Sequence, residues 1–401
     1  MYANLAILAI FIFVYSVIAG RIERLPISGP IVFVAFGLVC GPAGLGVLRL
    51  EITAEGLRLV AELALAVVLF SDAARIRLTV LEHSRQIPAR LLLIGLPLTI
   101  LLGTWVGRFI FPDLPLIEVA ILATMLAPTD AALGSSVVTN PKVPGEIREA
   151  LNVESGLNDG ICVPVLFLLL ALESQAETLT GGASLALRLV VEEIGIGLIC
   201  GLVLAGLGWW LVKRLSGGSW VDEGWRQIAG LALALGCFTS AQALGGSGFI
   251  ASFSGGLLFG ALARSQKSRL LRTAEGIGDL LSLTTWVAFG ATVVGQMMER
   301  ITWPVVAYAV LSLTLIRMAP VLVSLIGSPL RARARLFIGW FGPRGLASIV
   351  FIVIVLNHGL SGHETLSLVV VCTVVLSILA HGLSANPLVE ALTARSSKPG
   401  P

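Results

Sequence analysis

The sequence predicts an all-α polytopic membrane protein with about 13 transmembrane helices, arranged as two inverted six-helix repeats. Three observations lead to this fold class. Of the 401 residues, 56% are hydrophobic and 13% are charged, whereas a soluble domain carries about 25% charged residues. The apolar runs are long and do not alternate with polar residues, which favours helices over the strands of a barrel. Two of the runs are interrupted by a helix-breaking proline at corresponding positions of the expected repeats.

Apolar runs of roughly 17–25 residues divide the chain into thirteen predicted segments. They cover residues 3–20, 28–46, 56–71, 88–111, 116–138, 149–172, 185–212, 226–243, 247–263, 279–297, 302–326, 335–357 and 365–388. The first segment has no basic start and no cleavage site, so it is interpreted as a retained helix and not a signal peptide. We expect one transmembrane domain over residues 1–390 and a short cytoplasmic tail over residues 391–401.

Composition and charge restrict which partners, and which orientation in the membrane, are expected. The net charge of +3 gives no reason to expect a nucleic-acid partner. The five cysteines lie in apolar runs without CxxC spacing, so we expect no resident cofactor and no redox chemistry. Alternate loops hold 20 Lys and Arg against 5 in the others. This bias places the N-terminus outside and the C-terminus in the cytoplasm. The lack of a signal peptide and the compact tail favour the inner (plasma) membrane of a prokaryote.

Thirteen segments divide as six, one and six. Segment 1 then enters the membrane from outside and segment 8 from inside, so the two sets of six are expected to be inverted repeats. Segments 5 and 12 then correspond, and each contains a helix-breaking stretch, at residues 127–130 and 342–345. Proline removes an amide donor and clashes with the preceding turn. Backbone freed in this way is tolerated in a membrane only inside the protein or along a wet cavity. Broken helices at matching repeat positions therefore indicate a binding site near mid-membrane.

Residues 154–160 in the sixth segment read Glu-Ser-Gly-Leu-Asn-Asp-Gly. Ser155 and Asp159 are four residues apart and share one face of a helix, and Glu154 and Asn158 form the adjacent pair. A carboxylate and a hydroxyl are hard oxygen ligands, which suit Na⁺, Li⁺ or K⁺. Since charged residues within transmembrane segments are costly and usually functional, we interpret Asp159 and Ser155 as ion-binding residues.

Four other charged residues are interpreted by their position. Glu154 and Arg317 lie at similar predicted depths, roughly 10–13 Å from the same surface, and we interpret them as a structural ion pair. Asp130 and Arg344 lie at the two breaks, where they would compensate the partial charges of the exposed helix ends. Direct ion ligation by these two residues is the alternative.

Three more residues complete the candidate set. Thr129 has a hydroxyl and lies where backbone carbonyls are freed, so it is a candidate ligand. Asp72, near the inner end of the third segment, is either a site residue or a solvated helix end. Glu62 is interpreted as interfacial. His381, in the last segment, is interpreted as a core histidine, with pH sensing as the alternative.

With these motifs the sequence resembles the monovalent cation:proton antiporters of the NhaP/NHE type. The resemblance covers essentially the whole chain, and the string from Glu154 to Gly160 is its most specific part. It implies a homodimer in the lipid bilayer with no enzymatic activity. It also implies a dimerisation part, about residues 1–85 and 226–300, and a mobile core part, about residues 86–175 and 301–390. The broken helices 5 and 12 would cross beside the ion site.

The resemblance also implies roles for the site residues. Asp159 would bind Na⁺ or H⁺, while Ser155 and the backbone carbonyl of Thr129 would help to coordinate the metal ion. Asp72 matches an acidic position near the site. Asn158 before the aspartate is the pattern linked with electroneutral exchange.

The expected function is therefore one-for-one exchange of Na⁺, or Li⁺, for H⁺ by alternating access, with both ions competing for Asp159. A K⁺/H⁺ antiporter is the first alternative, because no feature of the sequence separates the two metal ions. A remote alternative is an intramembrane aspartyl protease, since residues 276–279 read Gly-Ile-Gly-Asp. That motif is weak, because the Asp72 context lacks the tyrosine that the second aspartate of such a protease requires.

Overall fold

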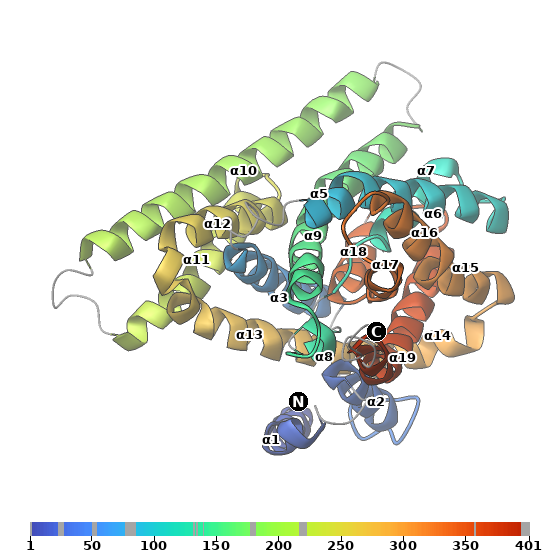
Figure 1. Ribbon diagram of the computed structural model, residues 1–401, viewed down its shortest axis with the longest axis horizontal. Coiled ribbons are helices and arrows are strands. Elements are labelled where there is room, and N and C mark those ends of the chain that lie inside the picture. Colours follow the sequence, from blue (N-terminus) through green and yellow to red (C-terminus); the bar gives the residue numbers. More distant parts are fainter. Residues whose placement is uncertain are drawn as a thin grey trace, which may run out of the picture. The chain divides into compact units, whose positions relative to one another are not determined.

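The chain is described by a computed structural model that covers residues 2–22, 28–49, 54–76, 86–130, 133, 135–138, 140–176, 182–215, 223–356 and 358–393. All regular secondary structure in these residues is helical (Figure 1), which confirms the all-α fold class. Residues 394–401 of the predicted tail lie outside the described part.

Seven helical stretches among the described residues are long and apolar enough to cross a membrane. They are Tyr2–Ile22, Gln86–Ile110, Gly145–Ser174, Val191–Leu215, Arg269–Met297, Trp303–Ser324 and His363–Leu392. Shorter apolar helices cover Gly29–Cys40, Leu116–Met125, Gln227–Ala243, Gly248–Ala263 and Leu346–Leu356. Each of the thirteen predicted segments contains helical residues. The count of thirteen crossings and the inverted repeats stay predictions.

The chain divides into two compact units. Unit 1 comprises Met1–Arg58, Gln86–Ser155 and Leu283–Pro401, and unit 2 comprises Leu59–Arg85 and Gly156–Ser282. One border falls inside a single continuous helix, α9 (Gly145–Ala176), directly after Ser155. These borders differ from those of the dimerisation and core parts expected from the sequence, and that functional division stays a prediction.

Unit 1 holds the N-terminal helices, the helices before α9 and the C-terminal third of the chain. Its elements are α1 (Tyr2–Ile22), α2 (Gly29–Cys40), α5 (Gln86–Arg90), η1 (Leu91–Gly95), α6 (Leu96–Ile110), α7 (Leu116–Met125), α8 (Ser135–Val138), η3 (Phe289–Val294), α14 (Gly295–Met297), η4 (Met298–Arg300), α15 (Trp303–Leu313), α16 (Leu315–Ser324), α17 (Ala332–Trp340), α18 (Leu346–Leu356) and α19 (His363–Thr393).

Glycines allow helices of unit 1 to approach closely. The Tyr308 hydroxyl of α15 donates a hydrogen bond to the Gly103 carbonyl of α6 over 3.1 Å. A Cβ at Gly107 would lie 2.6 Å from a methyl group of Val119 in α7. Small residues at such contacts are typical of membrane helices, which gain little from burying apolar groups against one another and depend on close packing.

Unit 2 contains most of α3 (Ala54–Arg75) and α13 (Lys267–Ala288), together with α10 (Gly182–Leu215), α11 (Glu223–Ala243), α12 (Gly248–Ala263) and η2 (Arg264–Gln266). The long helix α10 packs along α12 and also contacts α11 (Figure 1). A Cβ at Gly256 or Gly260 of α12 would lie 2.3 or 2.2 Å from a backbone oxygen of α3. These two glycines therefore bring α12 against the helix that carries Asp72.

Candidate functional site

The first break interrupts the fifth predicted segment. The helix α7 ends at Met125, residues 127–130 are not helical, and the short helix α8 begins at Ser135. Pro128 supplies no N–H and disfavours helical backbone at Ala127. Ala127 is 1% exposed and Thr129 is 4% exposed, so this irregular backbone lies inside the protein, where a membrane protein can tolerate it.

The second break interrupts the twelfth predicted segment. The helix α17 ends at Trp340, residues 341–345 are not helical, and α18 begins at Leu346. Pro343 has the same effect here as Pro128 has in the first break. Arg344 is completely buried, which requires strong hydrogen-bond acceptors around its guanidinium group.

The two breaks contact each other through their backbones and their charged side chains. The Asp130 N–H donates to the Pro343 carbonyl over 2.8 Å. The Leu346 N–H, at the start of α18, donates to Oδ2 of Asp130 over 3.0 Å. The guanidinium group of Arg344 donates to the carbonyls of Pro128, over 3.1 Å, and Ala127.

Each charge therefore lies at the helix end of opposite partial charge. Asp130 lies at the N-terminus of α18, where unpaired N–H groups are partly positive, and Arg344 lies just beyond the C-terminus of α7, where carbonyls are partly negative. This geometry is the one that charge compensation at the breaks requires.

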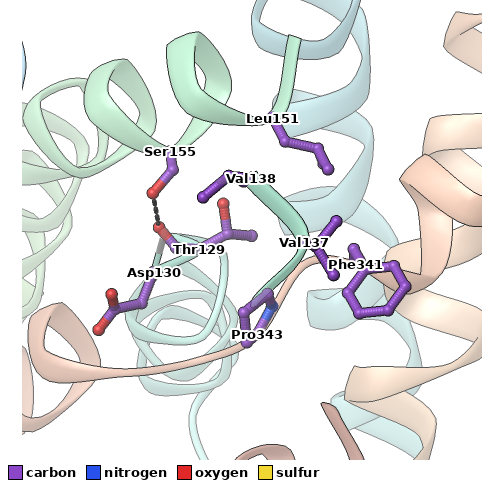
Figure 2. A pocket seen from close by; sticks show the side chains of 8 residues that line it. All are labelled: Thr129, Asp130, Val137, Val138, Leu151, Ser155, Phe341 and Pro343. Atoms are coloured by element: carbon purple, nitrogen blue, oxygen red, sulfur yellow. Dashed lines mark hydrogen bonds between the residues drawn. The ribbon is translucent and has the colours of Figure 1, made fainter. Parts of the chain in front are cut away.

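Thr129 is joined to α9 in the same unit. The Ser155 hydroxyl donates to the Thr129 carbonyl over 2.7 Å, and Ser155 is 5% exposed. Figure 2 shows these residues at a small pocket whose other walls are mainly apolar. The pocket is lined by Thr129, Asp130, Val137, Val138, Leu151, Ser155, Phe341 and Pro343.

Glu154, next to Ser155 on α9, contacts Arg317 of α16. Two hydrogen bonds of 2.5 and 2.9 Å join the two charged groups, and each side chain is 4% exposed. Removing one partner of such a buried pair costs about 3–5 kcal/mol, because the other charge stays buried. The pair therefore fixes this part of α9 against α16.

Asn158, Asp159 and Asp72 belong to unit 2. Asn158 is 1% exposed and Asp159 is 9% exposed. Asp159 follows Ser155 by one turn of the continuous helix α9. A Cβ built on Gly156 of α9 would lie 3.6 Å from the Cβ of Asp72 in α3. Asp72 therefore packs against α9 at Gly156, which is three residues before Asp159 in that helix. Glu62, interpreted from the sequence as interfacial, is 7% exposed.

Glu118 is absent from the predicted site although it is a fully buried carboxylate. It lies in the first turn of α7 and accepts hydrogen bonds from the Ser361 hydroxyl, over 2.6 Å, and the Gly362 N–H, over 2.9 Å. An acidic residue in the first turn of an apolar run, three positions after a proline, is a signal that could have revealed it. Ser348 of α18, whose hydroxyl donates to the Met125 carbonyl over 2.8 Å, has no such signal.

A helical chain with apolar membrane-length segments, two proline breaks and buried charges at both of them defines a multi-pass membrane protein. Residues 7–391 match the family model described as sodium/hydrogen exchanger, transmembrane. The chain therefore belongs to the sodium/hydrogen exchanger family, as the motifs in its sequence predicted.

Relatives and solved structures agree with this assignment. A K(+)/H(+) antiporter NhaP2 from Shewanella sp. (strain MR-4) is 25% identical over 90% of this chain. A K(+)/H(+) antiporter NhaP from Alkalimonas amylolytica is 24% identical over 96% of it. The chain spans 62% of the Shewanella protein and 66% of the Alkalimonas protein.

A probable Na(+)/H(+) antiporter from Schizosaccharomyces pombe is 27% identical over 76% of this chain and 42% of its own length. The structure of the sodium proton antiporter MjNhaP1 from Methanocaldococcus jannaschii at pH 8 is similar with a TM-score of 0.76 and 20% identity. The match covers 98% of this chain and 99% of the MjNhaP1 chain. The likeness shows that the two chains share a fold.

Proposed function

We propose that this protein exchanges Na⁺, or Li⁺, for H⁺ across the plasma membrane by electroneutral one-for-one antiport. The observation that carries the proposal is the Ser155–Thr129 hydrogen bond, one helical turn before Asp159 on α9. It brings a hydroxyl and a carbonyl of an irregular backbone to the helix face that also carries a carboxylate. Oxygen ligands of this kind suit a hard monovalent cation.

Competition for one carboxylate is sufficient for exchange. Either a proton or a cation can neutralise the carboxylate of Asp159, so the two compete for it. If the core part moves only when Asp159 is neutral, each cation that leaves must be replaced by one proton, since a bare carboxylate is costly to move within a membrane. Ser155 and the Thr129 carbonyl would coordinate the dehydrated cation, and Asp72 and Asn158 complete the proposed set of ion-binding residues.

Other residues would hold this geometry without binding the ion. Asp130 and Arg344 would compensate the helix ends at the breaks, and the Glu154–Arg317 pair would fix α9 against α16. Thirteen crossings, inverted repeats, an outer N-terminus, a cytoplasmic C-terminus and a homodimer belong to the same proposal. The sodium/hydrogen exchanger family to which the chain belongs supports the transport reading over the aspartyl protease.

The decisive variant is Asp159→Asn in proteoliposomes. We expect cation-driven proton flux to fall to the level of empty liposomes, because the amide neither ionises nor takes up a proton, while the thermal unfolding midpoint stays close to that of wild type. The matched control is Glu62→Gln, which neutralises another buried carboxylate of unit 2 that has no proposed ligand role. Flux that survives in Asp159→Asn would overturn the proposal.

Potassium is the second candidate cation. The Shewanella and Alkalimonas relatives are both K(+)/H(+) antiporters, and oxygen ligands do not by themselves exclude K⁺. Fluorescence dequenching with Na⁺, Li⁺ and K⁺ salts would separate the two candidates. The same assay with and without a clamped voltage would test electroneutrality, since one-for-one exchange is insensitive to the membrane potential.

A further inference from the structure

A polar stripe runs along one face of α19, an otherwise apolar helix. Ser377, His381 and Ser384 are spaced by four and three residues, so their side chains share this face. Ser377 is fully buried and His381 is 2% exposed. Buried polar groups at this density are costly unless each has a hydrogen-bond partner.

All three residues contact the second break or the residue before it. The Arg344 N–H donates to the Ser377 hydroxyl oxygen over 2.7 Å. Nε2 of His381 lies 2.8 Å from the carbonyl oxygen of Trp340, the last residue of α17. The indole N–H of Trp340 donates to the Ser384 hydroxyl over 2.9 Å. The stripe therefore contacts the chain on both sides of residues 341–343.

Each ring nitrogen of His381 faces a backbone carbonyl oxygen, Nε2 that of Trp340 and Nδ1 that of Ser377. A neutral imidazole has one N–H group, and the Trp340 carbonyl can only accept. With the proton on Nε2, His381 donates to Trp340, and Nδ1 can accept from the Ser377 hydroxyl at 3.2 Å. The other tautomer would donate from Nδ1 to the Ser377 carbonyl within the same helix, at 2.9 Å, and would leave Nε2 facing the Trp340 oxygen without a proton. The bond between α19 and α17 therefore requires the proton on Nε2.

We propose that Ser377 and His381 are positioning residues that fix the second break and, through Arg344, set the position of the Thr129 carbonyl. Arg344 transmits the effect, because its backbone is held by Ser377 while its guanidinium group holds the carbonyls of Ala127 and Pro128, directly before Thr129. This inference rests on the proposed function, because it predicts an effect on cation affinity.

Two substitutions of His381 separate the two ring nitrogens. Gln reaches to the place of Nε2 and can still donate to Trp340, whereas Asn reaches only to the place of Nδ1. In proteoliposomes we expect His381→Asn to raise the KM for the transported cation by about five- to tenfold, as for the loss of one buried hydrogen bond, with a smaller change in kcat. His381→Gln is expected to restore most of the affinity.

Ser377→Ala is the second test, matched by Ser367→Ala on the same helix. Ser367 is also buried, at 3% exposure, but its hydroxyl donates to the His363 carbonyl within α19. Ser377→Ala is expected to raise KM and Ser367→Ala to leave it unchanged. Because the substitution is small, it decides the question even if His381→Asn does not fold.

A merely structural role would give a different result. It would lower the unfolding temperature and the amount of active protein, which reduces the apparent kcat and leaves KM unchanged. Unchanged KM values in both Ser377→Ala and His381→Asn, or equal KM values in the Asn and Gln variants, would overturn the inference while wild-type exchange stands. Wild-type liposomes that show no cation-driven proton flux would instead overturn the proposed function, and this inference with it.

Discussion

The first break, at residues 127–130, and the second, at residues 341–345, have the same local cause but different supports. Each contains a proline between two helices, and each carries one buried or half-buried charge. The second break is joined to α19 by Ser377, and Trp340, the residue directly before the break, is joined to α19 by His381. The first is joined to the second break itself and to Ser155 of α9. One break thus serves as a support for the other, which carries the candidate ligand.

This difference teaches that an interrupted helix needs partners of two kinds. Donors and acceptors must replace the intrahelical hydrogen bonds that proline removes. A second set of contacts must then hold these new donors and acceptors in place. Arg344 connects two supports, because its guanidinium group binds the first break and its backbone N–H binds α19. The side chain and backbone N–H of Asp130 instead bind the start of α18 and Pro343 of the second break. We therefore expect substitutions in the second break to have the larger effects.

Arg344→Gln should have the largest effect. The shorter, neutral side chain cannot reach the Ala127 and Pro128 carbonyls, which would be left buried without their donor. A loss of about 3–5 kcal/mol is expected from removing a buried, hydrogen-bonded charge, together with loss of exchange. Thermal unfolding in detergent measures the first effect and proteoliposome flux the second. Arg344→Lys, which keeps the charge without the planar fork, should recover only part of the stability.

Gly345→Ala should have an intermediate effect. The new Cβ would lie 2.0 Å from Oδ2 of Asp130 and 2.5 Å from its Cβ, so the carboxylate would have to leave the N-terminus of α18. Overpacking of this kind costs about 1–3 kcal/mol. Gly145→Ala is the control in the same unit, because nothing lies within 4 Å of its added Cβ. Equal unfolding temperatures in these two variants would contradict the close approach of the breaks.

Asp130→Asn should have the smallest effect on stability. The amide oxygen can still accept from the Leu346 N–H, so the variant removes mainly the charge at the helix N-terminus. Such a charge is worth about 0.3–1 kcal/mol, and up to about 2 kcal/mol when partly buried. We expect a small fall in unfolding temperature and retained exchange. Abolished exchange in a stably folded Asp130→Asn would show that Asp130 acts on the ion directly, the alternative role considered for it.

Much of this arrangement could be predicted from the sequence, because proline and charged residues are energetically costly within apolar segments. Their presence there therefore has few structural explanations. Proline beside a charge at 128–130 and again at 343–344 indicated both breaks. Equal predicted depth indicated that Glu154 and Arg317 would contact each other, although they are 163 residues apart in the chain.

The neutral partners could not be predicted in this way. Serine within an apolar helix can bond to its own backbone, as Ser367 does, and nothing in the sequence distinguishes it from Ser377. Ser348 and Met125 are 223 residues apart, and no charge indicates their pairing. The borders of the two units were also beyond prediction, because one of them falls inside the uninterrupted helix α9.

The distance in the chain between Arg344 and Ala127 has a consequence for biosynthesis. The two residues are 217 positions apart, so at a ribosomal rate of about 5–20 residues per second the arginine is made roughly 10–40 s after the carbonyl it serves. Until then the newly inserted α7 ends in backbone that has no guanidinium to bind. The backbone after α7 must be kept hydrated or sheltered at the insertion machinery for that interval, and its contact with Arg344 forms only after the arginine has been made.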